Sequence, residues 1–381
     1  MNKYDYIILG AGASGLMLAY RLANDSFFDD KSILIIDKVK DKGNDRTWCY
    51  WEDDIGEWDD ILEKTWPTIY FGSPKYSKTI DISPYSYKML RSKKFYNKLW
   101  RVISKKSNIT FLEAEVKDFT TQKDEVLVTT NTDKFRCSKL FNSLQKSNFY
   151  KSQKKYPVIQ QHFLGWFVET EADTFDDSFA TFMDFNVAQN GNTRFMYVLP
   201  ISKRKALFEY TLFSKDLLKR KDYEDAIEDY LNKSGITAYK ITEKEMGSIP
   251  MTSFKFSKLN TKHILNIGTA GGWTKASTGY TFRNTTKNTK ALIEFLKGND
   301  DLSKFYKRSK FWWYDLLFLD VLANHNEEGS VLFASMFKNG SVKTILRFLD
   351  EESTLLEDLK IIFSVPPKRF LQYLLKRIFK V

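Results

Sequence analysis

Three glycines near the start of the chain have the spacing of a dinucleotide-binding turn. Gly10, Gly12 and Gly15 follow the apolar run 4–9 and precede the helix-like run 16–25. In such a turn the first glycine permits the tight bend, the second lets the backbone approach a diphosphate, and the third lets the helix lie against the strand. A diphosphate at the helix N-terminus is the chemistry that this spacing predicts. The predicted cofactor-binding residues between the glycines are Ala11, Ala13 and Ser14.

Asp37 lies where an acid would bind the ribose of such a cofactor. It ends the apolar run 33–36 and stands 22 residues after Gly15. A carboxylate at this position accepts hydrogen bonds from ribose hydroxyls, so FAD or NAD is expected instead of NADP. The first forty residues therefore predict a strand, a helix and a second strand that bind a dinucleotide.

A second glycine-rich segment favours FAD. The apolar run 264–267 ends at Gly268, and Gly271 and Gly272 follow before a helix-like stretch at 290–296. Many FAD enzymes have a strand ending in Gly-Asp in their last third, which returns to the ribityl and diphosphate part of the flavin. Thr269 replaces the Asp in this chain, and a glycine-rich loop without a ligand is the alternative interpretation.

The elements that would position these residues are those of a large folded chain. The chain has 381 residues, of which 43% are hydrophobic, so a sizeable core is expected. Cys49 and Cys137 are too few for a disulfide framework or a four-ligand zinc site, and a reducing cytosolic compartment is expected. The first residues enter a strand directly, which argues against a signal peptide, and no run of 18 apolar residues predicts a membrane span.

Charge and aromatic content are the unusual features of the composition. The net charge is +11, and 16% of the residues are Phe, Trp or Tyr. The basic residues are dispersed, and no arginine stripe or aromatic RNA-binding signature accompanies them, so nucleic acid is not an expected partner. The sequence leaves two explanations of the positive charge open, contact with an anionic membrane surface or a basic face that is only solvated.

Hydrophobic periodicity predicts an α/β fold with two sheets. A helix is expected at 92–104, an antiparallel insertion with a return strand within 109–141, four strands between 160 and 214, and a helix at 223–232. The prediction is a Rossmann-type FAD-binding domain, an antiparallel β-sheet substrate domain and a C-terminal helical portion. The predicted boundaries are 1–60, 105–145 and 255–300 for the FAD-binding domain, 61–104 and 146–254 for the substrate domain, and 301–381 for the helical region.

The end of the chain predicts a basic amphipathic helix. Phe370, Leu374, Ile378 and Val381 form one stripe, with Leu371 and Leu375 beside it, and five Lys or Arg residues surround them. Such a helix lies in a membrane interface or packs as an ordinary helix with solvated lysines. The sequence leaves both interpretations open.

Several longer motifs together resemble one enzyme family, the bacterial lycopene β-cyclases. The motifs occur in the family's order over about three-quarters of the chain. They are GAGASGL at 10–16, NDRTWCYW at 44–51, QQHFLGW at 160–166, FMDF at 182–185, YVLPIS at 197–202, LFEYT at 207–211, SIPMT at 248–252 and IGTAGGWTKASTGYTF at 267–282.

The resemblance implies a non-redox cyclisation of a carotenoid. In this family the acyclic ends of lycopene are protonated and closed to β-rings, giving γ-carotene and then β-carotene, while reduced FAD is required and not consumed. NAD(P)H is implied as the electron source, although the chain has no second GxGxxG. A water-insoluble substrate implies peripheral contact with the inner face of the cytoplasmic membrane.

The resemblance also implies the catalytic acid. The family's catalytic Glu aligns with Glu209, and burial among apolar residues would keep such a carboxyl protonated. Asp184 is the reserve candidate. The second acid of the family motif is replaced by Tyr210, which puts a two-carboxylate mechanism in doubt.

Aromatic rings and one arginine complete the predicted site. A ring face stabilises a nearby cation by about 0.5–2 kcal/mol when water is excluded. Arg46 is expected either near the flavin, where its charge would favour the anionic reduced form, or in a surface salt bridge. His162, His263 and His325 lack metal-ligand spacing, so no metal site is expected. The candidate aromatic residues are Trp48, Tyr50, Trp51, Trp166 and Trp273.

Two other classes of function remain consistent with the sequence. One is an FAD-dependent monooxygenase or reductase that acts on an isoprenoid or another apolar substrate. The other is a non-catalytic lipid-binding protein that retains the fold. The first would consume oxygen or NADPH in each turnover, and the second would be colourless when purified.

Overall fold

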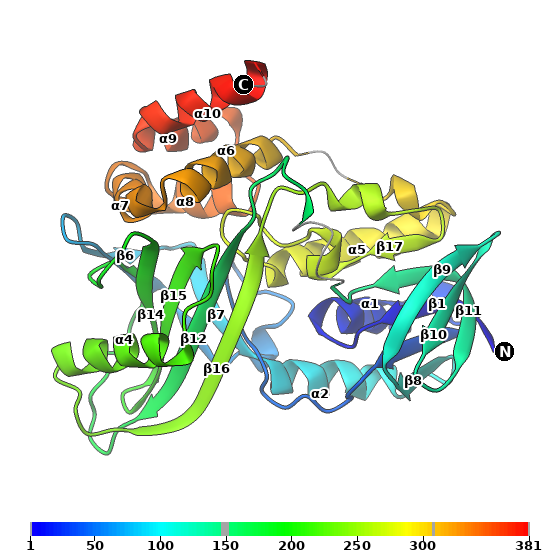
Figure 1. Ribbon diagram of the computed structural model, residues 1–381. Helices are drawn as coiled ribbons and strands as arrows, with labels where there is room; N and C mark the ends of the chain where they lie inside the picture. The colour runs from blue at the N-terminus through cyan, green and yellow to red at the C-terminus, as the bar shows by residue number, and fades with distance from the viewer. Residues whose placement is uncertain (1, 146–151, 307–308, 380–381) are drawn as a thin grey trace.

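The computed structural model describes residues 2–145, 152–306 and 309–379 (Figure 1). They form three β-sheets and a set of helices, of which the last five gather at the C-terminal end of the chain. The mixed α/β class and the C-terminal helical region expected from the sequence are confirmed.

The first sheet is the predicted dinucleotide-binding sheet. Its five parallel strands lie in the order β8, β2, β1, β11 and β17, and the antiparallel pair β10 and β9 extends it beyond β11. The strands are β1 (Lys3–Leu9), β2 (Ile33–Asp37), β8 (Ile109–Glu113), β9 (Val116–Gln122), β10 (Glu125–Thr130), β11 (Lys134–Asn142) and β17 (Ile264–Asn266). The antiparallel insertion with its return strand was predicted correctly.

Both faces of this sheet are covered because its central strands are apolar on both sides. Tyr6 and Ile8 of β1 pack against α1 (Ala13–Ala23), α2 (Ser92–Ile103) and α5 (Phe282–Gly298). Ile7 and Leu9 point to the opposite face, where they pack with side chains of β10 and β11. Continuous apolar runs of this kind are typical of parallel strands buried on both faces. Helix α2, which the sequence-based division assigns to the substrate domain, thus packs on the dinucleotide sheet.

The second sheet also has seven strands and is mostly antiparallel; it is called the substrate sheet below, after the substrate domain predicted from the sequence. Its order is β16, β12, β15, β14, β13, β5 and β6, and only the pair β13 and β5 is parallel. The strands are β5 (Thr68–Gly72), β6 (Lys78–Asp81), β12 (Ile159–Glu169), β13 (Ala180–Asp184), β14 (Thr193–Ser202), β15 (Lys205–Ser214) and β16 (Lys240–Met251). Helix α4 (Arg220–Lys233) crosses one face of this sheet (Figure 1), and the other face looks toward the dinucleotide sheet and the C-terminal helices.

The sequence interpretation did not identify strand β16, nor the strands between residues 47 and 91. The burial of β16 alternates regularly along ten residues, as in a strand with one solvated face, and it pairs with β12 over its full length. The four strands predicted between 160 and 214 and the helix at 223–232 are confirmed.

A small third sheet joins the two larger ones. It consists of β3 (Thr47–Asp53), β7 (Tyr85–Arg91) and β4 (Lys64–Trp66) in that order. Trp48 and Tyr50 of β3 pack against Phe282 at the start of α5, whereas Trp51 packs in the core of the substrate sheet. Short 3-10 turns lie at Ser26–Phe28, Asp59–Ile61, Phe256–Leu259, Gly268–Gly271, Leu302–Lys304 and Asn326–Glu328.

The C-terminal helices form a cap over one end of the substrate sheet (Figure 1). They are α6 (Phe311–Asn324), α7 (Gly329–Asn339), α8 (Val342–Leu349), α9 (Leu355–Ser364) and α10 (Pro367–Phe379). Among the described residues, no helix combines the length and the apolar character that crossing a membrane requires.

Helix α10 turns outward only part of the stripe predicted from the sequence, together with the two leucines beside it. Phe370 is half-buried beside Tyr373, which packs on α6 and α7, whereas Leu371, Leu375 and Ile378 are exposed. Val381 lies outside the described residues.

Candidate active site

A single cavity connects the dinucleotide sheet with the substrate sheet. Its volume is about 470 Å³, within the range typical of small-molecule sites. Gly12, Ser14 and Gly268 line one end, and Glu209 with several aromatic side chains lines the other. The predicted cofactor segments and the predicted acid therefore border the same space.

The glycines of the first turn have the three roles expected of them. Gly10 has φ +91°, which favours glycine, and a Cβ on Gly15 would lie 1.9 Å from the Gly10 carbonyl oxygen. A Cβ on Gly12, by contrast, would meet nothing within 4 Å. Gly12 thus borders open space at the N-terminus of α1, where a diphosphate could approach the backbone.

The second glycine segment meets the first through Gly268. Its φ is +60°, and a Cβ there would lie 2.4 Å from Ser14 Oγ. Gly268 and Thr269 line the cavity, whereas Gly271 and Gly272 do not. Gly271 instead fits against the carbonyl of Asn266, which shapes the loop without reaching the cavity.

Asp37 lies at the end of β2, next to the first turn. Its carboxylate accepts a hydrogen bond from Ala11 N and pairs with Lys42 Nζ at 2.7 Å. Asp37 does not line the cavity, but Lys42 does. The acid therefore holds the turn in shape and places a positive charge at the cavity wall.

The residues at this end fit the diphosphate of a dinucleotide. Helix α1 has no acidic residue in its first turn and no side-chain cap at Gly12, so its first amides are free donors. Lys42 and the exposed Arg46 add positive charge at the cavity, while Ala13 lines it without obstructing the helix end. The fit rests on these donors, on the two charges and on the open space beside Gly12.

Glu209 lies at the other end of the cavity, opposite a second glutamate. In the sheet, Gly165 of β12 pairs with Glu209 of β15 on one side and with Glu245 of β16 on the other. Paired residues in neighbouring strands project to the same face, so both carboxyl groups border the cavity across a residue without a side chain. A Cβ on Gly165 would approach Leu207 to 2.8 Å and Glu245 to 3.3 Å.

The two carboxyl groups have different surroundings. Burial raises the pKa of Glu209 to about 8, and the neighbouring charge of Glu245 adds to the rise. Burial also raises the pKa of Glu245, but Thr47 and Arg91 oppose this effect. We therefore assign the proton of the pair to Glu209 and the negative charge to Glu245.

A chain of hydrogen bonds holds the charge on Glu245. Thr47 Oγ1 donates to Glu245 Oε2 at 2.7 Å, and Arg91 Nη1 donates to Thr47 Oγ1 at 2.7 Å. Arg91 is buried, pairs with Glu243 and lies over the ring of Phe167. A second carboxyl group thus lies beside Glu209, and it comes from another strand and not from the neighbouring position 210.

Aromatic side chains surround the acid. Tyr197 pairs with Glu209 across β14 and β15. The Tyr87 hydroxyl lies 2.6 Å from that of Tyr197 and 3.1 Å from that of Tyr280. Of the five aromatic candidates from the sequence, Trp48 lines the cavity, whereas Trp166 lies in the core beneath α4. The aromatic residues that line the cavity are Trp48, Tyr87, Tyr96, Phe163, Phe182, Phe195, Tyr197, Phe213, Tyr280, Phe282, Phe333 and Phe337.

Asp184, the reserve acid, lies away from this cavity. Asn186 donates to its Oδ1 at 2.8 Å, and the Tyr230 hydroxyl of α4 donates to its Oδ2 at 2.8 Å. Its neighbour Met183 lines the cavity and Asp184 does not. The geometry therefore favours Glu209 as the acid and gives Asp184 a structural contact.

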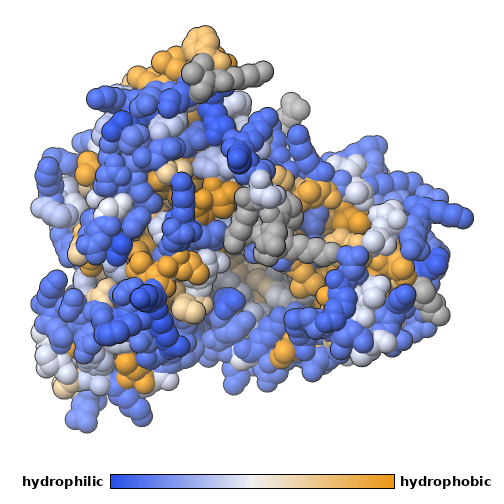
Figure 2. All heavy atoms as spheres, in the orientation of Figure 1, coloured by the Kyte–Doolittle hydropathy of each residue, from blue (hydrophilic) through white to orange (hydrophobic). Residues whose placement is uncertain are grey.

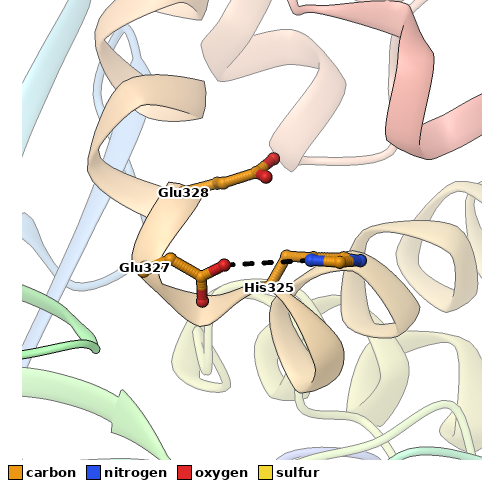
Figure 3. Close-up of side chains that lie close together, drawn as sticks. All are labelled: His325, Glu327 and Glu328. Atoms are coloured by element: carbon orange, nitrogen blue, oxygen red, sulfur yellow. Dashed lines mark ion pairs between the residues drawn. The ribbon is translucent and has the colours of Figure 1, made fainter.

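One trio of potential metal ligands lies elsewhere among the described residues (Figure 3). His325, Glu327 and Glu328 bring one ligand atom each to within 4.8 Å of one another. Glu328, however, binds Arg369 through both carboxylate oxygens. The three residues also lie outside the cavity that Glu209 borders.

The fold is that of FAD-dependent flavoproteins. A geranylgeranyl bacteriochlorophyll reductase-like protein of Thermoplasma acidophilum is 12% identical, with a TM-score of 0.63 over 98% of both chains. The flavin-dependent brominase Bmp2 is 15% identical, with a TM-score of 0.63 over the whole of both chains. A halogenase, PltM, in complex with FAD is 10% identical, with a TM-score of 0.58 over 91% of this chain and 79% of that one.

The chain belongs to the lycopene cyclase family, whose model, described as "Lycopene cyclase protein", matches residues 5–375. It is 24% identical to a lycopene beta-cyclase of Pantoea ananas over 65% of this chain and 63% of that protein. It is 25% identical to a capsanthin/capsorubin synthase of Citrus sinensis over 77% of this chain and 60% of that protein. The match thus spans less than two-thirds of each of these two relatives.

Proposed function

We propose that the protein is a lycopene β-cyclase that closes the acyclic ends of lycopene to β-rings without net oxidation or reduction. The observation that carries the proposal is the buried carboxyl group of Glu209, which borders an apolar, aromatic cavity that continues to the dinucleotide end and whose pKa burial raises to about 8. Protonating a carbon–carbon double bond requires an acid that keeps its proton and a pocket that excludes water from the cation.

Glu209 donates the first proton. Its carboxyl adds the proton to a terminal double bond of lycopene, and the resulting carbocation is attacked by a neighbouring double bond to close a six-membered ring. Loss of a proton from the ring leaves the product with the same atoms as the substrate. The proton returns to the Glu209–Glu245 pair, which restores the acid and balances the reaction.

Glu245 and the aromatic rings stabilise the cation. The carboxylate of Glu245, fixed by Thr47 and Arg91, is a negative charge that does not need to reorient during the reaction. Ring faces at the cavity wall add about 0.5–2 kcal/mol each where water is excluded. The Tyr87 hydroxyl is hydrogen-bonded to those of Tyr197 and Tyr280, and these contacts fix the three rings at the cavity wall.

FAD would be held by the first glycine turn, Ser14, Gly268 and the charges of Lys42 and Arg46. When bound in its reduced form, it would supply negative charge beside the cationic reaction path. We propose NAD(P)H as its electron source. Arg46 lines the cavity and would favour the anionic form of the reduced flavin.

A hydrocarbon substrate also has consequences for location. Lycopene dissolves in bilayers and not in water, so the proposed enzyme meets it at the inner face of the cytoplasmic membrane. The net charge of +11 is consistent with contact to anionic lipid headgroups.

Expression of the chain in a lycopene-producing bacterium tests the function. We expect lycopene to be replaced by γ-carotene and β-carotene, and purified protein with reduced FAD to convert lycopene in detergent without oxygen. Unchanged lycopene in cells that contain folded, flavin-loaded protein would contradict the proposal. Oxygen or NADPH consumption in proportion to product would indicate a monooxygenase or reductase, and a colourless protein a non-catalytic lipid binder.

The pH dependence of the purified protein follows from the assignment of the proton. The acid must be protonated to act, so we expect kcat to fall by about tenfold per pH unit above a pH of about 8. In Glu245→Gln the neighbouring negative charge is gone, so the pKa of Glu209 falls and the alkaline limb moves to lower pH. Measuring kcat for lycopene in detergent with reduced flavin across the pH range gives the pH at which the rate begins to fall.

Glu243→Gln is the matched control for this shift. Glu243 also pairs with Arg91 but does not line the cavity. Its substitution is expected to move the limb less than Glu245→Gln does. An alkaline limb that stays in place in Glu245→Gln would contradict the coupling between the two carboxyl groups.

A further inference from the structure

The outer face of the C-terminal cap is unusually apolar. Nine of the seventeen large hydrophobic side chains exposed among the described residues lie in α9 and α10, with exposed fractions between 38% and 80%. Figure 2 shows hydrophobic residues gathered at this end of the molecule. We call them the cap surface: Leu355, Leu356, Leu359, Ile362, Phe363, Leu371, Leu375, Ile378 and Phe379. Soluble surfaces rarely gather so many apolar side chains without a binding partner.

The opposite faces of both helices are firmly held. Ile361 of α9 packs in the core of the substrate sheet, and the buried Asp358 pairs with Lys310. Tyr373 of α10 packs beside α6 and α7, while Arg369 and Arg377 pair with Glu328 and Asp320. The cap surface is therefore the exposed face of two helices whose other faces are packed against the rest of the protein.

The charges around the cap surface indicate what covers it. Three exposed lysines, Lys360, Lys368 and Lys376, form no ion pair with any residue that the structure describes. The ammonium group of Lys376 lies over the ring of Tyr373. The two acidic residues within 355–379 do not neutralise these lysines, because Glu357 pairs with Arg347 and Asp358 pairs with Lys310. The surface thus combines apolar side chains with uncompensated positive charge.

A second copy of the chain fits this surface poorly. In a symmetric dimer the same patch meets itself, so the three lysines of each copy would face one another. An anionic lipid surface offers the opposite charge together with an apolar layer beneath it. Charge complementarity therefore favours a bilayer as the occupant.

We propose that the cap surface docks the protein on an anionic lipid bilayer, with the apolar side chains in the interface and the three lysines at the headgroups. The inference deepens the proposed function, because it names the surface through which a bilayer-dissolved substrate would be reached. Helix α7 connects the cavity with the cap surface. Its residues Phe333, Met336 and Phe337 line the cavity, and Ser335 Oγ donates a hydrogen bond to the carbonyl of Ser364 at the end of α9.

Vesicle flotation of the full-length protein tests the proposal without carotenoid. We expect it to float with phosphatidylcholine vesicles that contain phosphatidylglycerol and to float less with phosphatidylcholine alone. The triple variant Phe363→Glu, Leu371→Glu, Leu375→Glu is expected to lose at least about tenfold in partitioning, because it replaces three inserted apolar side chains by charges. Circular dichroism and the melting temperature check that the variant remains folded.

The matched control places the same substitutions on exposed apolar residues elsewhere. Phe27→Glu, Ile55→Glu and Leu217→Glu, combined in one chain, are expected to leave flotation within about twofold of the parent. A second variant, Lys360→Gln, Lys368→Gln, Lys376→Gln, keeps the apolar surface. It is expected to lose the preference for phosphatidylglycerol, by about fivefold for each charge.

Three results would overturn the docking surface. The first is a parent protein that does not float with either vesicle, and the second is a cap-surface variant that is folded and floats as well as the parent. The third is a parent dimer that the cap-surface variant converts to a monomer, with no vesicle binding, which would assign the surface to a second copy. Cyclisation of detergent-solubilised lycopene is measured separately, so failed cyclisation with intact flotation would contradict the proposed function alone.

Discussion

Replacing Glu209 by Gln is expected to leave lycopene unchanged in cells and to lower kcat of the purified protein by about 10²–10⁴-fold, the contribution typical of a general acid. The amide has the shape of the protonated carboxyl but no acidic proton to give. Thr211 Oγ1 donates to Glu209 Oε1 at 2.7 Å, and a Gln carbonyl accepts the same bond. The variant should therefore fold and bind flavin as the parent does, and the loss should lie in kcat.

Glu169→Gln is the control for this variant. Glu169 lies at the end of β12, outside the cavity, and pairs with Lys205 on the surface. Its loss removes a strand glutamate of the same sheet without touching the site, and β-carotene production should continue. Full β-carotene production in Glu209→Gln would remove Glu209 as the acid, whatever the effect of the control.

Replacing Gly12 by Asp is expected to remove the flavin while leaving the protein folded. Gly12 is the N-cap of α1, its backbone is extended, and a Cβ there meets no atom within 4 Å. Asp is a favoured N-cap residue, so the substitution should not lower the stability of helix α1. The added charge, however, faces the predicted diphosphate, and about 4 kcal/mol of repulsion at about 4 Å in an effective dielectric of about 20 weakens binding by roughly a thousandfold.

The flavin absorbance of purified protein, and its recovery on adding FAD, measure this effect. Gly12→Asn is the neutral control, because it has almost the same shape and lacks the charge, so it should bind flavin more tightly than Gly12→Asp. Gly15→Ala should behave differently, since its Cβ meets the Gly10 carbonyl and the variant should lose stability. Flavin retained at parental levels in Gly12→Asp would contradict the placement of the diphosphate at this turn.

Local sequence was sufficient for the cofactor end of the site. The roles of Gly10, Gly12, Gly15 and Asp37 depend on two strands, one turn and one helix that follow each other within residues 3–37. Spacing alone therefore predicted where the backbone is open and where helix and strand touch. It did not predict that Asp37 would bind Ala11 and Lys42, because Lys42 reaches it through a loop without regular periodicity.

The acid end depended on contacts between distant segments. The resemblance pointed to Glu209, but its partner Glu245 lies 36 residues later on a strand that the sequence interpretation did not identify. Only the pairing of β15 and β16 on either side of β12 brings the two together. A reader of the sequence could have found β16 from its alternating pattern, but not its register.

Burial was decided by tertiary structure in the same way. The sequence predicted an aromatic pocket and named Trp48, which lines it, but also Trp166, which packs beneath α4 on the other face of the sheet. In α10 it grouped Ile378 with Phe370 and Leu374 in one stripe, but Ile378 is exposed together with Leu371 and Leu375, whereas Phe370 and Leu374 are partly buried. Periodicity shows that residues share a face but not which face is covered.

The sequence by itself thus determined the dinucleotide turn, the four strands between 160 and 214 with the helix after them, and the family, because each of these is encoded by neighbouring residues or by motifs in a set order. The tertiary structure decided which carboxyl groups meet, which of them keeps its proton and which helix faces stay uncovered. These properties depend on strand register and on the packing of segments far apart in the chain, and local patterns do not carry that information.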